Sequence, residues 1–175
     1  MASAASDREL QLRPAALGQK QKFESSRYRR EKNVKYDDAS WHYGGSFPPD
    51  LETKAGATHI AMFTSWCVLN GVGGELHIED FADDLDRLRS REITPGEWFV
   101  DTCDGKFTDE DLNEEGNAFT AFYYSLEPAP YLADYEDTLG HGLASLYHVP
   151  DTWRSFDLLS PVISRRYEQW KQISV

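Results

Sequence analysis

Two aspartates and a histidine lie within six residues of one another, where they could transfer protons or hold a metal ion. Asp37 and Asp38 are followed by His42, and His59 comes later in the chain. Carboxylates and imidazoles exchange protons near neutral pH and bind divalent metals through oxygen and nitrogen. Paired metal ligands on a helix usually stand three or four positions apart, however, and this spacing matches no such motif. A small metal-dependent hydrolase centred on Asp37, Asp38, His42 and His59 is therefore the alternative hypothesis.

The preferred interpretation of the same segment is structural. Residues 36–49 combine turn-forming residues with large aromatic side chains, which favours an irregular but packed loop. We expect the two aspartates to cap or brace this loop. One of the two histidines, His42 or His59, should form a hydrogen bond between the loop and the rest of the domain. The side chains of Trp41, Tyr43 and Phe47 should bury the loop. On this interpretation the chain has no catalytic residue, no metal and no cofactor, and it is not an enzyme.

Other reactive motifs give no better candidate. The glycines Gly71, Gly73 and Gly74 follow a predicted helix instead of leading into one from a strand, so they are typical of a helix end and not of a phosphate-binding loop. Cys67 and Cys103 are the two cysteines of the chain, and both fall inside predicted helices. We interpret them as buried thiols because their spacing fits neither a disulfide framework nor a paired zinc site.

Charge is distributed unevenly along the chain. Residues 1–35 hold nine basic and four acidic residues, a net charge of +5; subtraction from the totals of 18 and 30 leaves nine basic and 26 acidic residues in 36–175, a net charge of −17. An exterior of this sign repels nucleic acid and attracts basic partners. We therefore expect a protein partner with a basic surface and no nucleic acid bound to the main domain.

Two acidic runs are the candidates for steering such a partner. Residues 75–86 and residues 104–115 carry six acidic residues each, and Lys106 is the single basic residue in the two runs. A solvated helix face is the ordinary explanation of one such run, but two runs in one small domain favour a charged docking surface. The residues that we predict to contact the partner are Asp83, Asp84, Asp86, Asp109, Glu110 and Asp111.

Hydrophobic periodicity predicts a series of helices. Residues 55–70 are apolar around nearly the whole helix circumference, which indicates a helix in the middle of a core, ended by Asn70 and Gly71. Residues 75–89 are amphipathic and predict a second helix. Thr94, with Pro95 and Glu97 behind it, predicts the next start through a capping box, and Gly105 its end.

The second half of the chain continues this pattern. Thr108 and Asp111 repeat the capping pattern ahead of one helix or two around Gly116, and residues 131–139 predict another helix. Asp151 is expected to cap a segment that follows it, and Ser160 with Pro161 to open a final helix. Residues 144–149 are an ambiguous strand candidate. The sequence thus predicts a mainly α fold: a basic N-terminal extension over 1–34, then a single compact multi-helix domain over 35–175 with a central apolar helix and an irregular aromatic N-terminal loop.

Membrane insertion is not expected. The longest apolar stretch, residues 60–69, is too short to cross a bilayer and is interrupted by Thr64 and Ser65. The start of the chain has none of the features of a cleavable leader. We therefore expect a cytoplasmic protein.

Residues 35–45 read KYDDASWHYGG, which resembles the opening signature of a bacterial domain family of unknown function. Further strings typical of this family occur at residues 47–48, 56–60, 103–107, 111–117 and 147–149. The resemblance covers about residues 34–171. Relatives of this kind resemble the small acidic proteins encoded beside polymorphic or secretion-delivered toxins, where they serve as immunity proteins. The resemblance implies a role in bacterial competition.

Together these observations favour an immunity protein that binds and neutralises a cognate bacterial toxin, such as a type VI secretion effector. The motivating features are the resemblance, the lack of a recognised catalytic motif and the acidic body. Besides the metal-dependent hydrolase, a second alternative is an adaptor or chaperone for a secreted effector. That alternative uses the same acidic surface and differs in whether the bound partner remains active.

Overall fold

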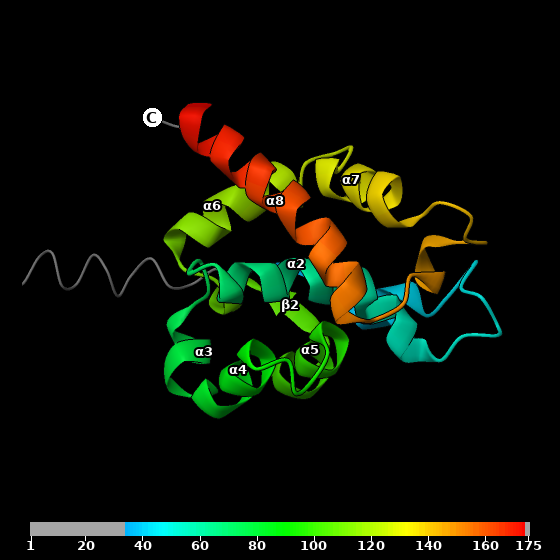
Figure 1. Ribbon diagram of the computed structural model, residues 1–175, viewed down its shortest axis with the longest axis horizontal. Coiled ribbons are helices and arrows are strands. Elements are labelled where there is room, and N and C mark those ends of the chain that lie inside the picture. Colours follow the sequence, from blue (N-terminus) through cyan, green and yellow to red (C-terminus); the bar gives the residue numbers. More distant parts are fainter. Residues whose placement is uncertain (1–33, 174–175) are drawn as a thin grey trace, which may run out of the picture. The chain divides into compact units, whose positions relative to one another are not determined.

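Helix α2, Thr58–Leu69, runs through the centre of the fold. The computed structural model of the chain describes residues 34–173, and within them α2 is surrounded on all sides. Residues 58–68 of this helix are all buried, because apolar or small side chains occupy its whole circumference. Helices α6, α7 and α8 lie on one side of α2 and helices α3, α4 and α5 on the other (Figure 1). The predictions of a mainly α fold and of a central apolar helix are confirmed.

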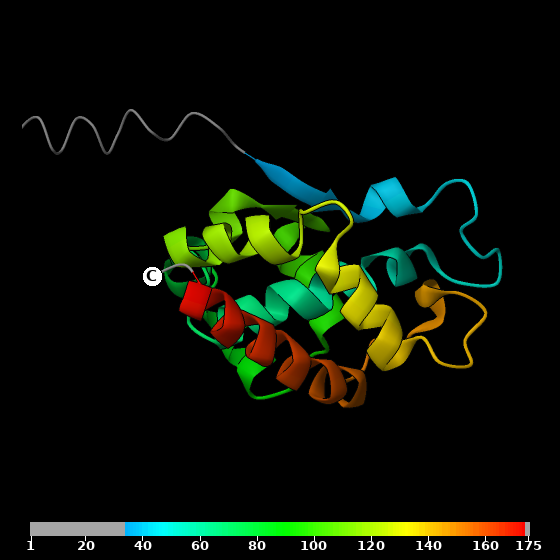
Figure 2. The same cartoon turned by 90° about the horizontal axis from the view of Figure 1, so that it is seen from above.

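The remaining elements are short, apart from the last helix. The other α-helices of the described residues are α3 (Glu75–Glu79), α4 (Ala82–Arg89), α5 (Pro95–Cys103), α6 (Glu114–Tyr123), α7 (Pro130–Leu139) and α8 (Trp153–Ile173). The strands are β1 (Lys35–Asp38) and β2 (Lys106–Thr108), and the 3-10 helices are η1 (Ala39–His42), η2 (Thr53–Ala57), η3 (Asp109–Asp111) and η4 (Leu146–His148). Figure 2 shows β1 on one side of α2 and α8 on the opposite side.

Strands β1 and β2 form an antiparallel pair in which Asp37 lies opposite Phe107 and Asp38 opposite Lys106. The prediction of an irregular loop over 36–49 was thus wrong for its first residues, because pairing with a strand about seventy positions later orders them. The strand candidate at 144–149 was also wrong, since that segment contains η4. The pairing anchors β1 beside the core and leads the chain directly into η1.

The start of α5 follows the sequence prediction closely. The Thr94 hydroxyl accepts a hydrogen bond from the Glu97 backbone N–H at 3.2 Å, and the Glu97 carboxylate accepts one from the Thr94 backbone N–H at 2.8 Å. This reciprocal capping box satisfies two amides that the helix itself leaves free. The helix ends at Asp104, which adopts a left-handed conformation with φ of 53° ahead of Gly105.

Three helix boundaries differ from the prediction. The amphipathic stretch 75–89 divides into α3 and α4 at Asp80 and Phe81. Helix α8 continues through Pro161, which is exposed. Proline has no N–H to donate to the carbonyl group four residues earlier, and on the exposed side of the helix water can take the place of that donor. The hydroxyl of Thr152, and not Asp151, accepts the hydrogen bond from a first-turn amide, that of Ser155 at 3.2 Å.

A carboxylate joins the three helices on one side of α2. Asp134 on α7 accepts two hydrogen bonds from the Arg166 guanidinium on α8, at 2.7 and 2.8 Å, and one from the Tyr123 hydroxyl on α6 at 2.8 Å. Because this paired geometry fixes orientation as well as distance, it sets the positions of α6 and α7 against α8. Helix α7 in turn forms part of the cavity described below.

The described residues belong to one structural unit that begins at Val34. The predicted basic extension, residues 1–34, lies outside the described residues except for Val34. Within 34–173, no helix combines the length and the apolar composition that crossing a bilayer requires.

Candidate functional site

The Asp37, His42 and His59 side chains meet at one end of the fold. Asp37 is at the end of β1, His42 at the end of η1 and His59 in the first turn of α2. Asp37 Oδ1 lies 2.9 Å from His42 Nε2, and Asp37 Oδ2 lies 3.6 Å from His59 Nε2. The two imidazole rings stand nearly perpendicular, with centroids 4.5 Å apart. We call these three residues the His-Asp cluster.

Further hydrogen bonds hold the Asp37 carboxylate in place. The Tyr124 hydroxyl donates to Oδ2 at 2.6 Å and the Asp38 backbone N–H donates to Oδ1 at 2.8 Å. Burial alone would raise the pKa of Asp37, but the hydrogen bonds from His42, His59 and Tyr124 outweigh it and hold that pKa well below its ordinary value. The carboxylate is therefore ionised at neutral pH, fixed between two imidazoles.

The cluster opens onto a small cavity. Both imidazoles line a space of about 280 Å³, together with Leu132, Tyr135, Leu146 and Tyr147. His42 Nδ1 lies 3.3 Å from the Tyr147 hydroxyl, on η4. Since the walls are otherwise mainly apolar and aromatic, the two histidines are the strongest polar groups available to a small molecule or ion that enters.

Asp38 and Trp41, the other two residues of the motif predicted in this segment, lie outside the cluster. The Asp38 carboxylate accepts hydrogen bonds from Lys35 Nζ at 2.7 Å, from the Ser40 hydroxyl at 2.7 Å and from the Ser40 backbone N–H at 3.0 Å, and these lower its pKa to about 2. It caps η1, as the structural interpretation predicts. The expected burial of Trp41 and Tyr43 was wrong, because their side chains are 60% and 42% exposed.

Acidification from pH 7 to pH 5 is expected to destabilise the fold through His59. Burial lowers the pKa of this side chain below 6.5, although Asp37 partly opposes the shift. The unfolded chain therefore takes up the proton more readily than the folded chain. This contribution to the free energy of unfolding is complete at a pH above the unfolded-state pKa, and it is lost as the pH falls from that pKa towards the lower folded-state pKa. Urea unfolding at pH 7, 6 and 5, with a chelator present, measures this slope. The change in the free energy of unfolding with pH should be smaller in His59→Gln than in the wild type. It should be unchanged in the control variant His141→Gln, which alters an exposed histidine. An equally large change in His59→Gln would contradict the assignment to His59.

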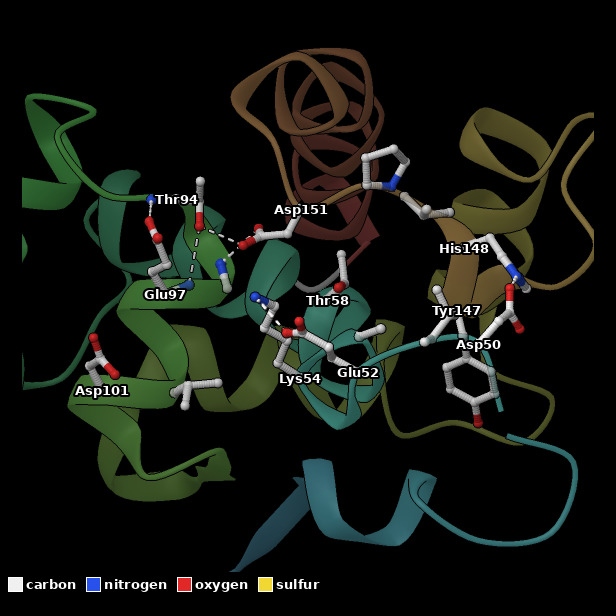
Figure 3. A pocket seen from close by; sticks show the side chains of 16 residues that line it. Asp50, Glu52, Lys54, Thr58, Thr94, Glu97, Asp101, Tyr147, His148 and Asp151 are labelled. Atoms are coloured by element: carbon white, nitrogen blue, oxygen red, sulfur yellow. Dashed lines mark hydrogen bonds and ion pairs between the residues drawn. The ribbon is translucent and has the colours of Figure 1, made fainter. Parts of the chain in front are cut away.

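A second, larger hollow adjoins this cavity. It has a volume of about 660 Å³ and is lined by residues from the segments 50–58, 94–101 and 147–151, and Tyr147 lines both spaces. Figure 3 shows Glu97 and Asp101 on α5, Glu52 and Lys54 from the segment around η2, and Asp50 beside His148. We call this hollow the acidic groove. Its charged lining residues are Asp50, Glu52, Glu97, Asp101, Asp151 and Lys54.

Two of these carboxylates also build the groove. The Asp151 carboxylate accepts hydrogen bonds from the Thr94 hydroxyl at 2.5 Å and from the Gly96 backbone N–H at 2.9 Å. It therefore supports the start of α5, where a negative charge is favourable, and not the start of α8 as predicted. A side chain at position 96 would overlap the Asp151 carboxylate, so this approach requires a glycine. The Glu97 carboxylate supports the same helix start, because it accepts a hydrogen bond from the Thr94 backbone N–H at 2.8 Å.

The predicted steering residues of the first acidic run remain on the surface but are partly neutralised. Asp84 forms an ion pair with Arg87 at 3.4 Å, and Asp86 forms one with Arg89 at 3.1 Å. Asp83 is exposed on the same helix. The two arginines come directly after the acidic run, and their positions three residues after their partners predict these pairs.

The second acidic run is divided between the surface and the interior. Glu110 is exposed, while the half-buried Asp109 accepts a hydrogen bond from the Val34 backbone N–H at 2.9 Å. The placement of Asp111 on a contact surface was wrong, because this side chain is buried. Its carboxylate lies 2.9 Å from His77 Nε2 and accepts a hydrogen bond from the Thr108 backbone N–H at 2.7 Å.

Asp111 belongs to a second group of potential metal ligands, with His77 and Cys103. Both His77 and Asp111 are buried, and burial raises the pKa of the Cys103 thiol well above its usual value. The thiol is therefore protonated at neutral pH, the form that binds metals poorly. Cys67 is fully buried, as predicted, whereas Cys103 is only half-buried.

Comparison with known proteins places most of this arrangement within one family. A profile for a domain of unknown function (DUF7832) matches residues 35–149, which is more than half of the chain and includes the His-Asp cluster and most of the acidic groove. Comparisons with curated proteins and with solved structures found no match. The chain therefore belongs to the DUF7832 family of domains of unknown function.

Proposed function

We propose that this chain is an immunity protein, which binds a cognate toxin or effector through the acidic groove and thereby neutralises it. The observation that carries the proposal is the concentration of negative charge in a groove large enough for side chains of a partner. Five carboxylates line it against one ammonium group, a net charge of −4 when His148 is counted as neutral. The resemblance of the sequence to small acidic immunity proteins supports the biological context.

The lining fits lysine or arginine side chains of a partner. Such side chains have an apolar stem and a charged end, and the groove offers both kinds of surface: Leu51 and Val100 for the stem and the surrounding carboxylates for the charge. Lys54 offsets one of the five carboxylates, because its ammonium group is paired with Glu52 at 2.8 Å, and four remain without a lysine or arginine partner in the groove lining. Asp50 and Glu52 are 70% and 77% exposed in their side chains, so a partner can reach both carboxylates.

Exposed aromatic side chains of the neighbouring η1 segment can provide the anchors of the complex. Trp41 and Tyr43 belong to the segment of η1, which packs against η2, and η2 forms part of the groove. Exposed tryptophan and tyrosine often contribute most of the binding free energy of an interface. The charge of the domain would then set the association rate, and these rings the lifetime of the complex.

Reversing the charge of the groove is expected to abolish protection. The test co-expresses the toxin gene next to this chain's gene with wild-type protein or with the triple variant Asp50→Lys, Glu52→Lys, Asp101→Lys. Wild type should restore growth and the triple variant should not. With the purified pair, the association rate should fall about 10- to 100-fold at low salt, and the difference should shrink at high salt, as expected for electrostatic steering.

Two matched triple variants locate the interface. Charge reversal at Glu136, Asp137 and Glu168, exposed residues of α7 and α8, makes the same change in net charge elsewhere and should leave protection intact. Reversal at Asp83, Asp84 and Asp86 tests the surface predicted from sequence. If that variant loses protection while the groove variant keeps it, the groove is not the interface. A neighbouring gene without toxicity, or a partner that stays active in the complex, would overturn the immunity function itself and favour an adaptor or chaperone.

A further inference from the structure

We propose that Asp37, His42 and His59 form a binding site for a divalent transition-metal ion such as Zn²⁺. The inference is independent of the proposed function, because it concerns the His-Asp cluster and not the groove. Two imidazoles and one carboxylate are a ligand set that zinc and divalent iron use when a coordination position is kept open for water or substrate. The three side chains offer ligand atoms that all lie within 4.8 Å of one another.

The distances fit an ion shared by the three side chains. Ligand atoms that stand about 2.0 to 2.1 Å from a tetrahedral zinc ion are separated from each other by about 3.3 Å. Asp37 Oδ1 lies 2.9 Å from His42 Nε2 and Asp37 Oδ2 lies 3.6 Å from His59 Nε2, so each imidazole stands close to this separation from one of the two carboxylate oxygens. One ligand atom from each of the three side chains lies within 4.8 Å of the others, and a bound ion would draw these atoms closer together.

The Asp37 carboxylate is also oriented for a metal ion by its other hydrogen-bond partners. Tyr124 and the Asp38 backbone N–H hold the carboxylate from behind, at 2.6 and 2.8 Å. Supporting hydrogen bonds of this kind orient metal ligands and commonly change affinity by about 10- to 100-fold.

The surroundings leave room for a further ligand. Both imidazoles line the cavity of about 280 Å³, while the charged end of Asp37 is not part of its wall. The Tyr135 ring lines the same cavity and packs against the His59 ring, with centroids 6.2 Å apart. An ion held by the two imidazoles and Asp37 would therefore face open space on the cavity side, where water or a small anion could complete its coordination.

The other group of potential ligands is a weaker candidate. His77, Cys103 and Asp111 line neither of the two hollows described above. His77 and Asp111 are also buried, 1% and 4% exposed, so water or a substrate has little access to an ion between them. This second group provides an internal control, because a metal bound there would be coordinated by sulfur.

Titration of the tag-free, full-length protein with Zn²⁺ and with Co²⁺ tests the site, after treatment with a chelator and dialysis. One ion should bind per chain, and His42→Ala should weaken binding at least about 100-fold, more than the loss of a supporting hydrogen bond would. His42 is suited to the test because its side chain is 24% exposed, and denaturant unfolding will show that the variant is folded. The Co²⁺ complex should show visible bands of nitrogen and oxygen coordination without a thiolate charge-transfer band.

The controls separate this site from others. His148→Ala and Cys103→Ser should bind as the wild type does, and Tyr124→Phe, which keeps all three ligands, should bind about 10-fold more weakly. The proposal is overturned if neither ion binds at micromolar concentrations, if His42→Ala binds as tightly as wild type, or if Cys103→Ser abolishes binding. None of these measurements depends on a toxin, so their outcome is separate from that of the immunity experiment.

Discussion

Replacement of Phe63 by Ala is expected to lower the free energy of unfolding by about 3 to 5 kcal/mol. Phe63 is fully buried in the middle of α2. Its ring has five aromatic neighbours with centroids between 4.9 and 6.1 Å away, which come from β2, α6, the residue after α6, and α7: Phe107, Phe119, Tyr123, Tyr124 and Tyr131. Truncation removes the buried area of the ring and leaves a cavity that this rigid group of rings cannot fill.

Equilibrium unfolding in urea, monitored by tryptophan fluorescence, measures this loss. Leu158→Ala on α8 is a suitable control, because that side chain is 55% exposed and its truncation should change stability by less than about 0.5 kcal/mol. A loss below about 1 kcal/mol in Phe63→Ala would mean that the rings repack around the gap. The packing of α2 against both sides of the fold would then be less specific than the structure indicates.

Removal of the Asp37 carboxylate should be about as damaging. In Asp37→Ala, His42 and His59 lose the anion between them, and the buried Tyr124 hydroxyl loses its acceptor. Deleting one member of a buried charged network costs about 3 to 5 kcal/mol, because the remaining polar groups stay buried without partners. Tyr124→Phe removes one hydrogen bond and should cost about 1 kcal/mol.

Chemical unfolding at pH 7 in the presence of a chelator separates this effect from any effect of a metal. Asp101→Asn is the matched control, since it neutralises an exposed carboxylate of α5 and should leave stability within about 0.5 kcal/mol of wild type. If Asp37→Ala is as stable as the control, then the cluster contributes little to folding. In that case the arrangement of its side chains would need another explanation, of which a binding role is the most direct.

Local signals in the sequence predict local features of this fold well. The capping box at the start of α5 depends on Thr94 and Glu97 alone, which are three positions apart, and the structure contains it. The burial of α2 follows from the apolar composition of one continuous stretch. In both cases the residues that determine the structure are neighbours in the sequence, so no knowledge of the rest of the chain is needed.

Pairing between distant segments could not be predicted in this way. Strands β1 and β2 are only four and three residues long, too short to show an alternating pattern, and they are stable because they pair with each other. Helix α8 passes through Pro161 because its first turn is capped by Thr152 and because packing holds the helix on both sides of the proline. Tertiary contacts decide these elements, and they outweigh the local preference.

The two sites differ in how far the sequence indicated them. Asp37, His42 and His59 were candidates because of their residue types, but their spacing fits no regular helix or strand. They meet because the chain passes from β1 through η1, makes a wide loop over 43–52 and returns through η2 into α2. The groove left no comparable signal, since Asp50, Asp101 and Asp151 are about fifty positions apart and none lies in either acidic run. A concentration of charge in space is visible only once the fold is known.

Tyr147 lines both the small cavity at the two histidines and the acidic groove beside it. A movement of this ring changes the shape of both spaces at once. Occupants of the two spaces would then be thermodynamically linked: a partner that favours one position of the ring would alter the affinity for an ion by a certain factor, and the ion would alter the affinity for the partner by the same factor.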